Sequence, residues 1–437
     1  MDPIILGLLG MGGMLVLIML HVPIGVAMGI SGFIGVGFLI GWGPAVSLFG
    51  TEPSSKIASE ELAVLALFLL MGGLAGLAGL AADMYKLFYA LIGHKRGGLA
   101  MATIGGCAGF GAVCGSSVAT AATFTRVALP EMLKRNYQPG LAGGCIAAGG
   151  TLGMIIPPSL VMIIYGILTE EFVIALFAAA IIPGLISVVF YFITIWIYTK
   201  IKPEAGPPGP PMPWPERIKV IKECWGIVFL AGVVSGGIYS GVFTVTEAAS
   251  VGATIAFFFA VARGRVTWNT FLGTLRETAG NTGLIYVIIM GASIFAYFVT
   301  LSHLPDALVT AIMGLGLPPL MVICLFMLMY LILGSVFDTV AAMVITLPFV
   351  FPVIVELGYD PIWWGVVNVV AMEIGMITPR IDMNVFVLHG VAKDLPLKTI
   401  FGGILPFFCA DVVRLAVIVI FPGIVLWLPK AWGLMGG

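Results

Sequence analysis

The sequence contains few charged residues. Only 9% of its 437 residues are Asp, Glu, Lys or Arg, and 60% are hydrophobic, whereas soluble domains carry about 25% charged residues. So few charges cannot cover a water-facing surface. Apolar runs recur from residue 3 to residue 428, and many reach the length of about 20 residues that a helix needs to cross a bilayer. The chain is therefore predicted to be an all-α polytopic membrane protein lying in the lipid bilayer.

Other absences exclude whole classes of function. The chain has no basic cluster with interleaved aromatics and a net charge of -1, so no nucleic-acid partner is predicted. It contains no GxxxxGK[ST] loop, so nucleotide hydrolysis does not drive it directly. The six cysteines lack paired spacing and the four histidines are scattered, so packing roles are favoured over disulfides or a transition-metal site.

The N-terminus and the charged loops set the predicted topology. The opening "MDPIILGLLGMGG" carries no Lys or Arg, unlike a secretory signal, so the first apolar stretch is expected to remain as a membrane span. Residues 200–222 form a Pro-rich linker, predicted to be stiff and extended and, from its Lys and Arg residues, cytoplasmic. It separates a first half, 1–199, from a second half, 223–437. Counting spans from the linker places both termini in the periplasm.

Most of the chain is assigned to membrane spans. In the first half they are predicted near 3–20, 23–41, 61–80, 141–164 and 172–199, and in the second near 224–241, 246–262, 281–300, 362–391 and 400–428. Each half also contains a hairpin, near 98–133 and near 318–354. Polar tips argue that the hairpins are re-entrant, because backbone freed at membrane depth must be buried in protein or line a wet cavity. Two full crossings would equally return the chain to the same side.

The two halves share short motifs in the same order. "MGGLAG" at Met71 and "MGASIF" at Met290 are 219 residues apart, as are "GSSVAT" and "GSVFDT", while the Gly-Met-Ile frames at Gly153 and Gly375 are 222 apart. A nearly constant offset, with a three-residue insertion, indicates a duplicated unit. Opposite orientation in the membrane makes it an inverted repeat, as in many secondary transporters. Chance matches among Gly, Met and Ala are the alternative.

The hairpin tips carry the residue types that an ion site needs. Gly115-Ser116-Ser117 and Gly334-Ser335 are each expected to begin a new half-helix, after a half-helix whose free carbonyls favour a cation. Oxygen donors suit Na⁺. Close helix packing through small hydroxyl residues is the alternative, although an ionised group at membrane depth is expensive unless it is used. The candidate sodium-binding residues are Ser116, Ser117, Gly153, Ser335, Asp338, Thr339, Gly375 and Thr378.

A broken span follows each hairpin. "GGTLGMIIPPS" and "AMEIGMITPRIDMN" contain prolines that interrupt a helix, and paired interruptions in two halves point to a binding site. Only the second copy is charged, and Arg380 can hold a carboxylate through two parallel hydrogen bonds. A structural ion pair of Arg380 with Asp382 or Asp338 is the alternative. The candidate substrate-binding residues are Pro157, Ser159, Pro379, Arg380, Asp382 and Asn384.

Four stretches together resemble one family. "GCAGFGAVCGSSVATAA", "LGMIIPPS", "GVFTVTEAASVGA" and "GMITPRIDMN" are similar, in order and spacing, to the large membrane subunit of tripartite ATP-independent periplasmic (TRAP) transporters. The resemblance covers nearly the full chain. Val245 stands where the family pattern has proline, and the central linker is longer than expected.

The resemblance implies a function, a location and partners. It implies a Na⁺-driven importer of organic acid anions in the bacterial inner membrane, working with a small four-helix membrane subunit and a periplasmic substrate-binding protein. It also implies an elevator, in which a domain containing both hairpins slides against a scaffold. One arginine serves a dicarboxylate, a sugar acid or a keto acid equally well, so the cargo stays open.

Three other classes compete with this interpretation. A stand-alone Na⁺/dicarboxylate symporter of the same fold differs only in its partners. An intramembrane aspartyl protease using Asp338 and Asp382 is disfavoured, because Arg380 would keep Asp382 ionised whereas a shared-proton dyad needs one protonated carboxyl. A channel would need a charged or aromatic filter ring, which the sequence lacks. The chain is therefore predicted not to be an enzyme, and no catalytic residue is assigned.

Overall fold

A computed structural model describes residues 2–378, 383–393 and 395–435, with the side chain of residue 383 left aside. The described part is built from helices α1 to α22 and one short 3₁₀ helix, η1. Within this described part, eight helical segments are long and apolar enough to cross a membrane, by length and composition. The prediction of an all-α, multi-pass membrane protein is thereby supported.

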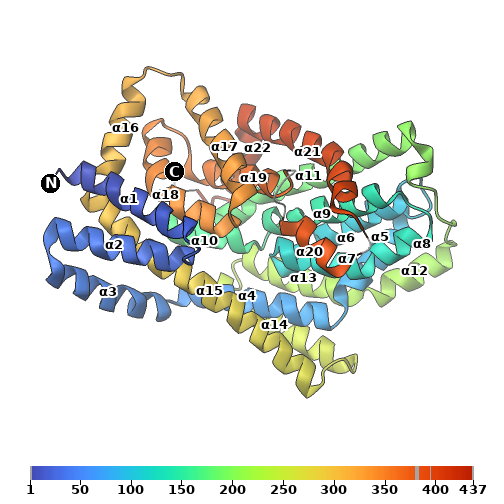
Figure 1. The fold of residues 1–437 in the computed structure, drawn as a ribbon. Coiled ribbons are helices and arrows are strands. Elements are labelled where there is room, and N and C mark those ends of the chain that lie inside the picture. The colour runs from blue at the N-terminus through green and yellow to red at the C-terminus, as the bar shows by residue number, and fades with distance from the viewer. Residues whose placement is uncertain (1, 379–382, 394, 436–437) are drawn as a thin grey trace.

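The helices of the first half follow one another with short connections (Figure 1). Their bounds are α1 Pro3–Met19, α2 Ile24–Ile40, α3 Trp42–Ile57, α4 Glu60–Leu77, α5 Leu80–Ile92, α6 Gly98–Cys114, α7 Ser117–Val127, α8 Leu129–Lys134, α9 Pro139–Ile155, α10 Leu160–Thr169 and α11 Val173–Ile201.

The linker and the second half follow (Figure 1). The linker contains η1 Pro203–Ala205 and nearly all of α12 Trp214–Glu223. The helices of the second half are α13 Trp225–Tyr239, α14 Val245–Ala262, α15 Trp268–Leu301, α16 Leu304–Gly314, α17 Pro319–Val336, α18 Thr339–Glu356, α19 Pro361–Met376, α20 Met383–Val391, α21 Leu397–Ile420 and α22 Gly423–Ala431.

The linker differs from its prediction. An extended segment was expected over 200–222, but residues 200 and 201 end α11, η1 follows, and α12 occupies 214–223. Proline at the second position of α12 is compatible with a helix, because the first amides of a helix have no intrahelical partner. The extended part is thus confined to 206–213, where Gly209 donates its N–H to the Gly93 carbonyl at 3.1 Å.

Helix starts recur at a fixed spacing. Pro3 and Trp225 begin α1 and α13, Ser117 and Thr339 begin α7 and α18, and Pro139 begins α9 as Pro361 begins α19. In each pair the second residue lies 222 positions after the first. The packing is reciprocal as well: α2 packs on α15 and α14 on α4, while α7 packs on α20 and α10 on α18. Two similar halves exchange equivalent contacts in this arrangement.

Glycine allows the closest helix contacts. A Cβ added to Gly291 of α15 would lie closer than 2 Å to the Gly25 carbonyl of α2, and one added to Gly403 of α21 would meet the Gly140 carbonyl of α9. Side chains at these positions would force the helices apart. In membranes, where lipid competes for apolar surface, such small-residue contacts are a main source of helix association.

Candidate ion and substrate site

The first hairpin breaks where its sequence predicted. α6 ends at Cys114, Gly115 adopts a left-handed conformation with φ of 64°, and Ser116 caps the N-terminus of α7. The Ser116 hydroxyl accepts the Ala119 N–H at 3.4 Å. Ser117 is buried at the first position of the new half-helix.

The second hairpin breaks later than predicted. Gly334-Ser335 was expected to begin a half-helix, but α17 continues through both residues to Val336, and α18 begins at Thr339 with Asp338 as its cap. The Ser335 hydroxyl donates to the Ile332 carbonyl at 2.7 Å, which accommodates serine in the last turn of a helix. The Asp338 carboxylate accepts the Val340 N–H at 3.1 Å.

This correction changes the correspondence between the halves. The caps Ser116 and Asp338 are 222 positions apart, the same offset as the Gly-Met-Ile frames. The Gly-Ser match at 219 is therefore not a structural equivalence, and the three-residue insertion inferred from it is wrong at the hairpin tips. The two tips have caps at equivalent positions but different chemistry: a neutral hydroxyl caps one half-helix and a carboxylate caps the other.

Glycines seat each tip against a broken helix. A Cβ on Gly153 would lie 3.0 Å from the Ser116 carbonyl oxygen, and a Cβ on Gly375 would lie 2.9 Å from the Cα of Gly334. Both candidate glycines thus sit in backbone contact with the tips of their own halves. The Ser116 carbonyl also accepts the Thr120 hydroxyl at 2.7 Å.

The break of the first half lies beside the first tip. α9 ends at Ile155, and Ser159 caps α10 by accepting the Met162 N–H at 3.4 Å while its hydroxyl donates to the Met154 carbonyl. A Cβ on Gly115 would lie 3.0 Å from the Pro158 carbonyl oxygen. The predicted residues Pro157 and Ser159 are therefore close to the tip that carries Ser116.

The break of the second half is described up to Thr378. The Thr378 hydroxyl donates to the Ile374 carbonyl at 2.9 Å, so it is engaged at the end of α19. Pro379, Arg380 and Asp382, which carry the predicted carboxylate-binding function, lie outside the described residues.

A hydrogen bond between two candidate residues, Ser117 and Asn384, joins the two halves. The Asn384 Nδ2 of α20 donates to the Ser117 Oγ of α7 at 2.8 Å and to the Ala147 carbonyl of α9 at 3.2 Å, and both side chains are buried. The structure thus brings a predicted substrate residue together with a predicted sodium residue 267 positions away. The segment after the second break rests against the hairpin of the first half.

A cavity of about 210 Å³ opens at the second tip. Its volume exceeds the roughly 30 Å³ share of one liquid water several times. Ser335 and Asp338 supply its polar side chains and Phe386 an apolar wall. The residues that line it are Gly334, Ser335, Val336, Phe337, Asp338, Met376 and Phe386. The cavity is thus formed by the end of α17, the start of α18, the end of α19 and α20.

The other predicted residues divide between the two tips. Thr339 donates its hydroxyl to the Met376 sulfur at 2.9 Å and so touches the cavity wall. Ser116, Ser117 and Gly153 belong to the first tip and do not line this cavity. Two separate tip-and-break pairs therefore result, each built within one half.

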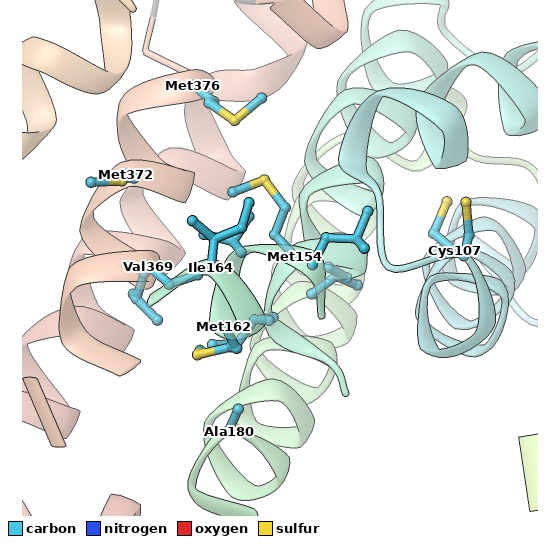
Figure 2. Close-up of a cluster of buried hydrophobic side chains, with 14 of the residues drawn as sticks. Cys107, Met154, Met162, Ile164, Ala180, Val369, Met372 and Met376 are labelled. Carbon is cyan, nitrogen blue, oxygen red and sulfur yellow. The ribbon is translucent and has the colours of Figure 1, made fainter. Parts of the chain in front are cut away.

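Methionine fills the space between the broken helices. Figure 2 shows Met154 and Met162 from the first half and Met372 and Met376 from the second, in one buried cluster with Ile164. Methionine is flexible and polarisable, and it fills irregular gaps. This apolar layer lies directly beside both breaks.

The sequence interpretation missed a buried charged cluster. Glu373 of α19 and Asp411 and Arg414 of α21 are fully buried, and Tyr191 of α11 contacts them. The available signal was the spacing of Asp411 and Arg414, three residues apart in an apolar helix, which places both on one face.

The fold of this chain resembles that of a solved transporter structure. The YdaH transporter of Alcanivorax borkumensis, a solved structure, aligns over 100% of both chains with a TM-score of 0.62 and 16% identity. The two chains therefore share a fold, which is that of a multi-pass membrane protein.

Sequence comparisons then identify the family. The family described as "Tripartite ATP-independent periplasmic transporter, DctM component" matches residues 11–424. The C4-dicarboxylate TRAP transporter large permease protein DctM of Pseudomonas aeruginosa is 34% identical over 89% of this chain and 90% of its own length. The sialic acid TRAP transporter large permease protein SiaM of Vibrio cholerae is 31% identical over 83% and 84%. The chain belongs to the DctM component family of TRAP transporters, which confirms the resemblance drawn from the sequence.

Proposed function

We propose that this chain is the large permease of a sodium symporter that imports organic acid anions. The observation that supports it most is the cavity at the second hairpin tip, where Asp338 and Ser335 meet the end of α19. Family membership supports transport by a permease subunit. Relatives are named for C4-dicarboxylates and for sialic acid, and both substrates carry carboxylates.

Sodium occupies the second tip in this proposal. The carboxylate of Asp338 offsets the charge of the ion, and Ser335, Thr339, Gly375 and Thr378 contribute hydroxyl or carbonyl oxygens around it. The last carbonyls of α17 point toward the tip, and the free carbonyls at a helix end carry partial negative charge. A second sodium binds at the first tip, through Ser116, Ser117 and Gly153, without a carboxylate.

The substrate carboxylate pairs with Arg380 in this proposal. Arg380 follows Thr378 by two residues and precedes Asn384 by four, so the chain connects it to both the cavity and the first hairpin. Its planar fork suits a carboxylate. Pro379 and Asp382 belong to the same proposed substrate-binding set, and Pro157 and Ser159 are its neutral members from the first half.

The architecture is that of an inverted repeat with two re-entrant hairpins. The recurrence of helix starts at 222 positions and the reciprocal packing of α2 on α15 and α14 on α4 support this assignment. In an elevator motion, the unit with both hairpins and both broken helices slides against the remaining helices. The first repeat is 1–199, the cytoplasmic linker is 200–222 and the second repeat is 223–437. The chain lies in the bacterial inner membrane, with both termini on the periplasmic side.

A small four-helix membrane subunit and a periplasmic substrate-binding protein complete the transporter. The word "tripartite" in the family description and the words "large permease" in the relatives' names support this assignment. A stand-alone symporter of the same fold is the rival, and co-purification with a small membrane protein separates the two.

Ligand-dependent stabilisation of the purified chain tests the site. A ligand that binds only the folded state raises the melting temperature by mass action. We expect a C4-dicarboxylate, sialic acid, a sugar acid or a keto acid to stabilise the chain in Na⁺ buffer and not in K⁺ buffer, while the corresponding neutral amides do nothing. If none of the four ligands stabilises the chain in a sodium-dependent way, the proposed site is contradicted.

A further inference from the structure

Helix α12 of the linker packs on the chain through one of its faces. Arg217, Val220 and the C-cap Cys224 are the residues of this region that are partly or fully buried. The Cys224 Sγ donates to the Asp83 carbonyl of α5 at 3.1 Å, and the Arg217 Nη2 lies 3.5 Å from the His94 Nδ1 in the loop after α5. The three residues are spaced by three and four positions, so they form a single docked face.

A second face of α12 is apolar and exposed. Trp214, Ile218 and Ile221 of α12 and Trp225, which begins α13, are spaced by four, three and four positions, which places them in one line along a helix. Their exposed fractions lie between 41% for Ile221 and 69% for Trp214. We call these four residues the apolar stripe. The described part of the chain leaves the apolar stripe uncovered.

The charged residues of α12 have a fixed order around the helix. By helical periodicity, Lys222 lies next to the apolar stripe, Lys219 follows, and Glu223 and Glu216 lie opposite the stripe. All four are exposed, and neither lysine belongs to an ion pair within the described residues. Long lysine stems can lie along apolar surface while the ammonium groups reach polar surroundings. Lysines beside the apolar face and acids away from it are therefore the arrangement expected of a helix at a membrane surface.

Exposed tryptophans indicate where that surface lies. Trp196 lies in the last two turns of α11, and Trp225 and Trp268 begin α13 and α15. The predicted spans 224–241 and 246–262 cross and return, so all three tryptophans lie on the linker's side of the membrane. Tryptophan is enriched at the membrane–water interface, and the Lys200 Nζ lies 5.0 Å above the Trp196 ring. Because Trp225 also belongs to the apolar stripe, α12 joins the membrane at this level.

We propose that α12 is an interfacial helix that binds the surface of an anionic lipid bilayer. The apolar stripe lies at the boundary between headgroups and acyl chains, and Lys219 and Lys222 contact the headgroup phosphates. Charge complementarity selects anionic lipid, because residues 200–222 contain five basic residues against two acidic ones. Basic clusters beside a membrane span or on an amphipathic helix are typical of binding to anionic lipids. The inference does not depend on sodium or substrate binding.

The lipid contact completes the attachment of the linker. On the side of the protein, the Gly97 N–H donates to the Gly206 carbonyl at 2.9 Å, and the Gly209 N–H donates to the Gly93 carbonyl at 3.1 Å. Both bonds join the linker to the loop between α5 and α6, where the first hairpin begins (Figure 1). The linker is thus held between the base of this hairpin and the lipid surface.

Fluorescence quenching by brominated lipids tests the position of α12 in the whole chain. In a cysteine-free background, Ile218→Cys, Ile221→Cys and Glu216→Cys are each labelled with bimane and reconstituted into bilayers that contain brominated phosphatidylglycerol or brominated phosphatidylcholine. All three positions are exposed, so the variants should elute in gel filtration as the unlabelled chain does. We expect quenching at Ile218 and Ile221 and little at Glu216, because Glu216 lies opposite the apolar stripe. Absence of quenching at both isoleucine positions overturns the proposal.

The preference for anionic lipid is measured in the same bilayers. A lysine near an anionic surface contributes about 1 kcal/mol, which is about fivefold in affinity, so the label at Ile218 should report a preference for phosphatidylglycerol of up to about 25-fold. Replacing both Lys219 and Lys222 by Gln should abolish the preference, whereas replacing both by Arg, the matched control, should retain it. Equal quenching by the two lipids, or a preference that survives the glutamine variant, overturns the proposal. Quenching that disappears when a small membrane subunit is added also overturns it, in favour of a protein partner on the apolar stripe.

Discussion

The substitution Asp338→Asn separates the helix cap that Asp338 forms from its proposed function as a sodium ligand. Asp338 caps α18 by accepting the Val340 N–H at 3.1 Å, and it lines the cavity at the second tip. Asparagine caps helices about as well as aspartate, so the fold should remain. The negative charge that would offset Na⁺ in the proposed site is lost.

The size of the effect follows from electrostatics. Two unit charges about 4 Å apart attract by about 1 kcal/mol in bulk water and about 4 kcal/mol at an effective dielectric constant of about 20. Asp338 is exposed at the cavity, so we expect a loss of roughly 1 to 3 kcal/mol. Since about 1.4 kcal/mol is tenfold, the Na⁺ concentration for half-maximal uptake should rise about 5- to 150-fold.

The assay is uptake into proteoliposomes over a series of Na⁺ concentrations, with a matched control. Asp360 is also an N-cap: its carboxylate accepts the Ile362 N–H at 2.9 Å at the start of α19, and it does not line the cavity. Asp360→Asn should therefore leave the Na⁺ dependence unchanged. If Asp338→Asn and Asp360→Asn behave alike, the assignment of Asp338 to sodium is refuted.

Three further predictions concern the substrate, the topology and the contact between the halves. Arg380→Lys keeps the charge but loses the fork, so uptake should fall about ten- to a hundredfold, from the roughly 1.5 to 3 kcal/mol of a hydrogen bond to a charged group, at unchanged melting temperature; near-normal uptake would favour a structural ion pair. In a cysteine-free background, an impermeant thiol reagent added outside should label Ser54→Cys and not Glu204→Cys, both at exposed positions, and the reverse result would invert the topology. Asn384→Ala leaves the buried Ser117 hydroxyl without its amide partner, so the free energy of unfolding should fall by about 1 to 3 kcal/mol. The double variant Ser117→Ala, Asn384→Ala should lose less free energy of unfolding than the two single variants together.

Long apolar helices could be predicted from the sequence because length and hydropathy decide them. Spans predicted at 172–199 and 246–262 correspond to α11, Val173–Ile201, and α14, Val245–Ala262. Short helices such as α3 and α16 escaped prediction. α3 mixes apolar residues with Pro53 and Lys56, and neither helix has the length of a span.

The end of α17 shows the limit of motif matching. A Gly-Ser pair is compatible both with a tip and with the last turn of a helix, and only the hydrogen bond of Ser335 to Ile332 distinguishes them. The cap at Asp338 sets the true break, three residues later than the motif suggested.

The rest of the site depends on contacts between residues far apart in the sequence, which local sequence patterns do not predict. Ser117 and Asn384 were both selected as candidates, but for different ligands, and their hydrogen bond appears only once α20 packs against α7. The same holds for Glu373 and Arg414, which are 41 positions apart and pair at 2.9 Å. Glu373 is a single charge in its apolar helix, and only the fold brings it to Arg414.

The central claim is that a sodium gradient drives carboxylate import through this chain. It is tested most directly by uptake of a labelled C4-dicarboxylate and of labelled sialic acid into proteoliposomes that contain the chain with its small subunit and binding protein. The account predicts that at least one of these anions accumulates against its gradient when Na⁺ is high outside, and that accumulation stops when Na⁺ is equal on both sides or replaced by K⁺. Accumulation that persists at equal Na⁺ concentrations would contradict it.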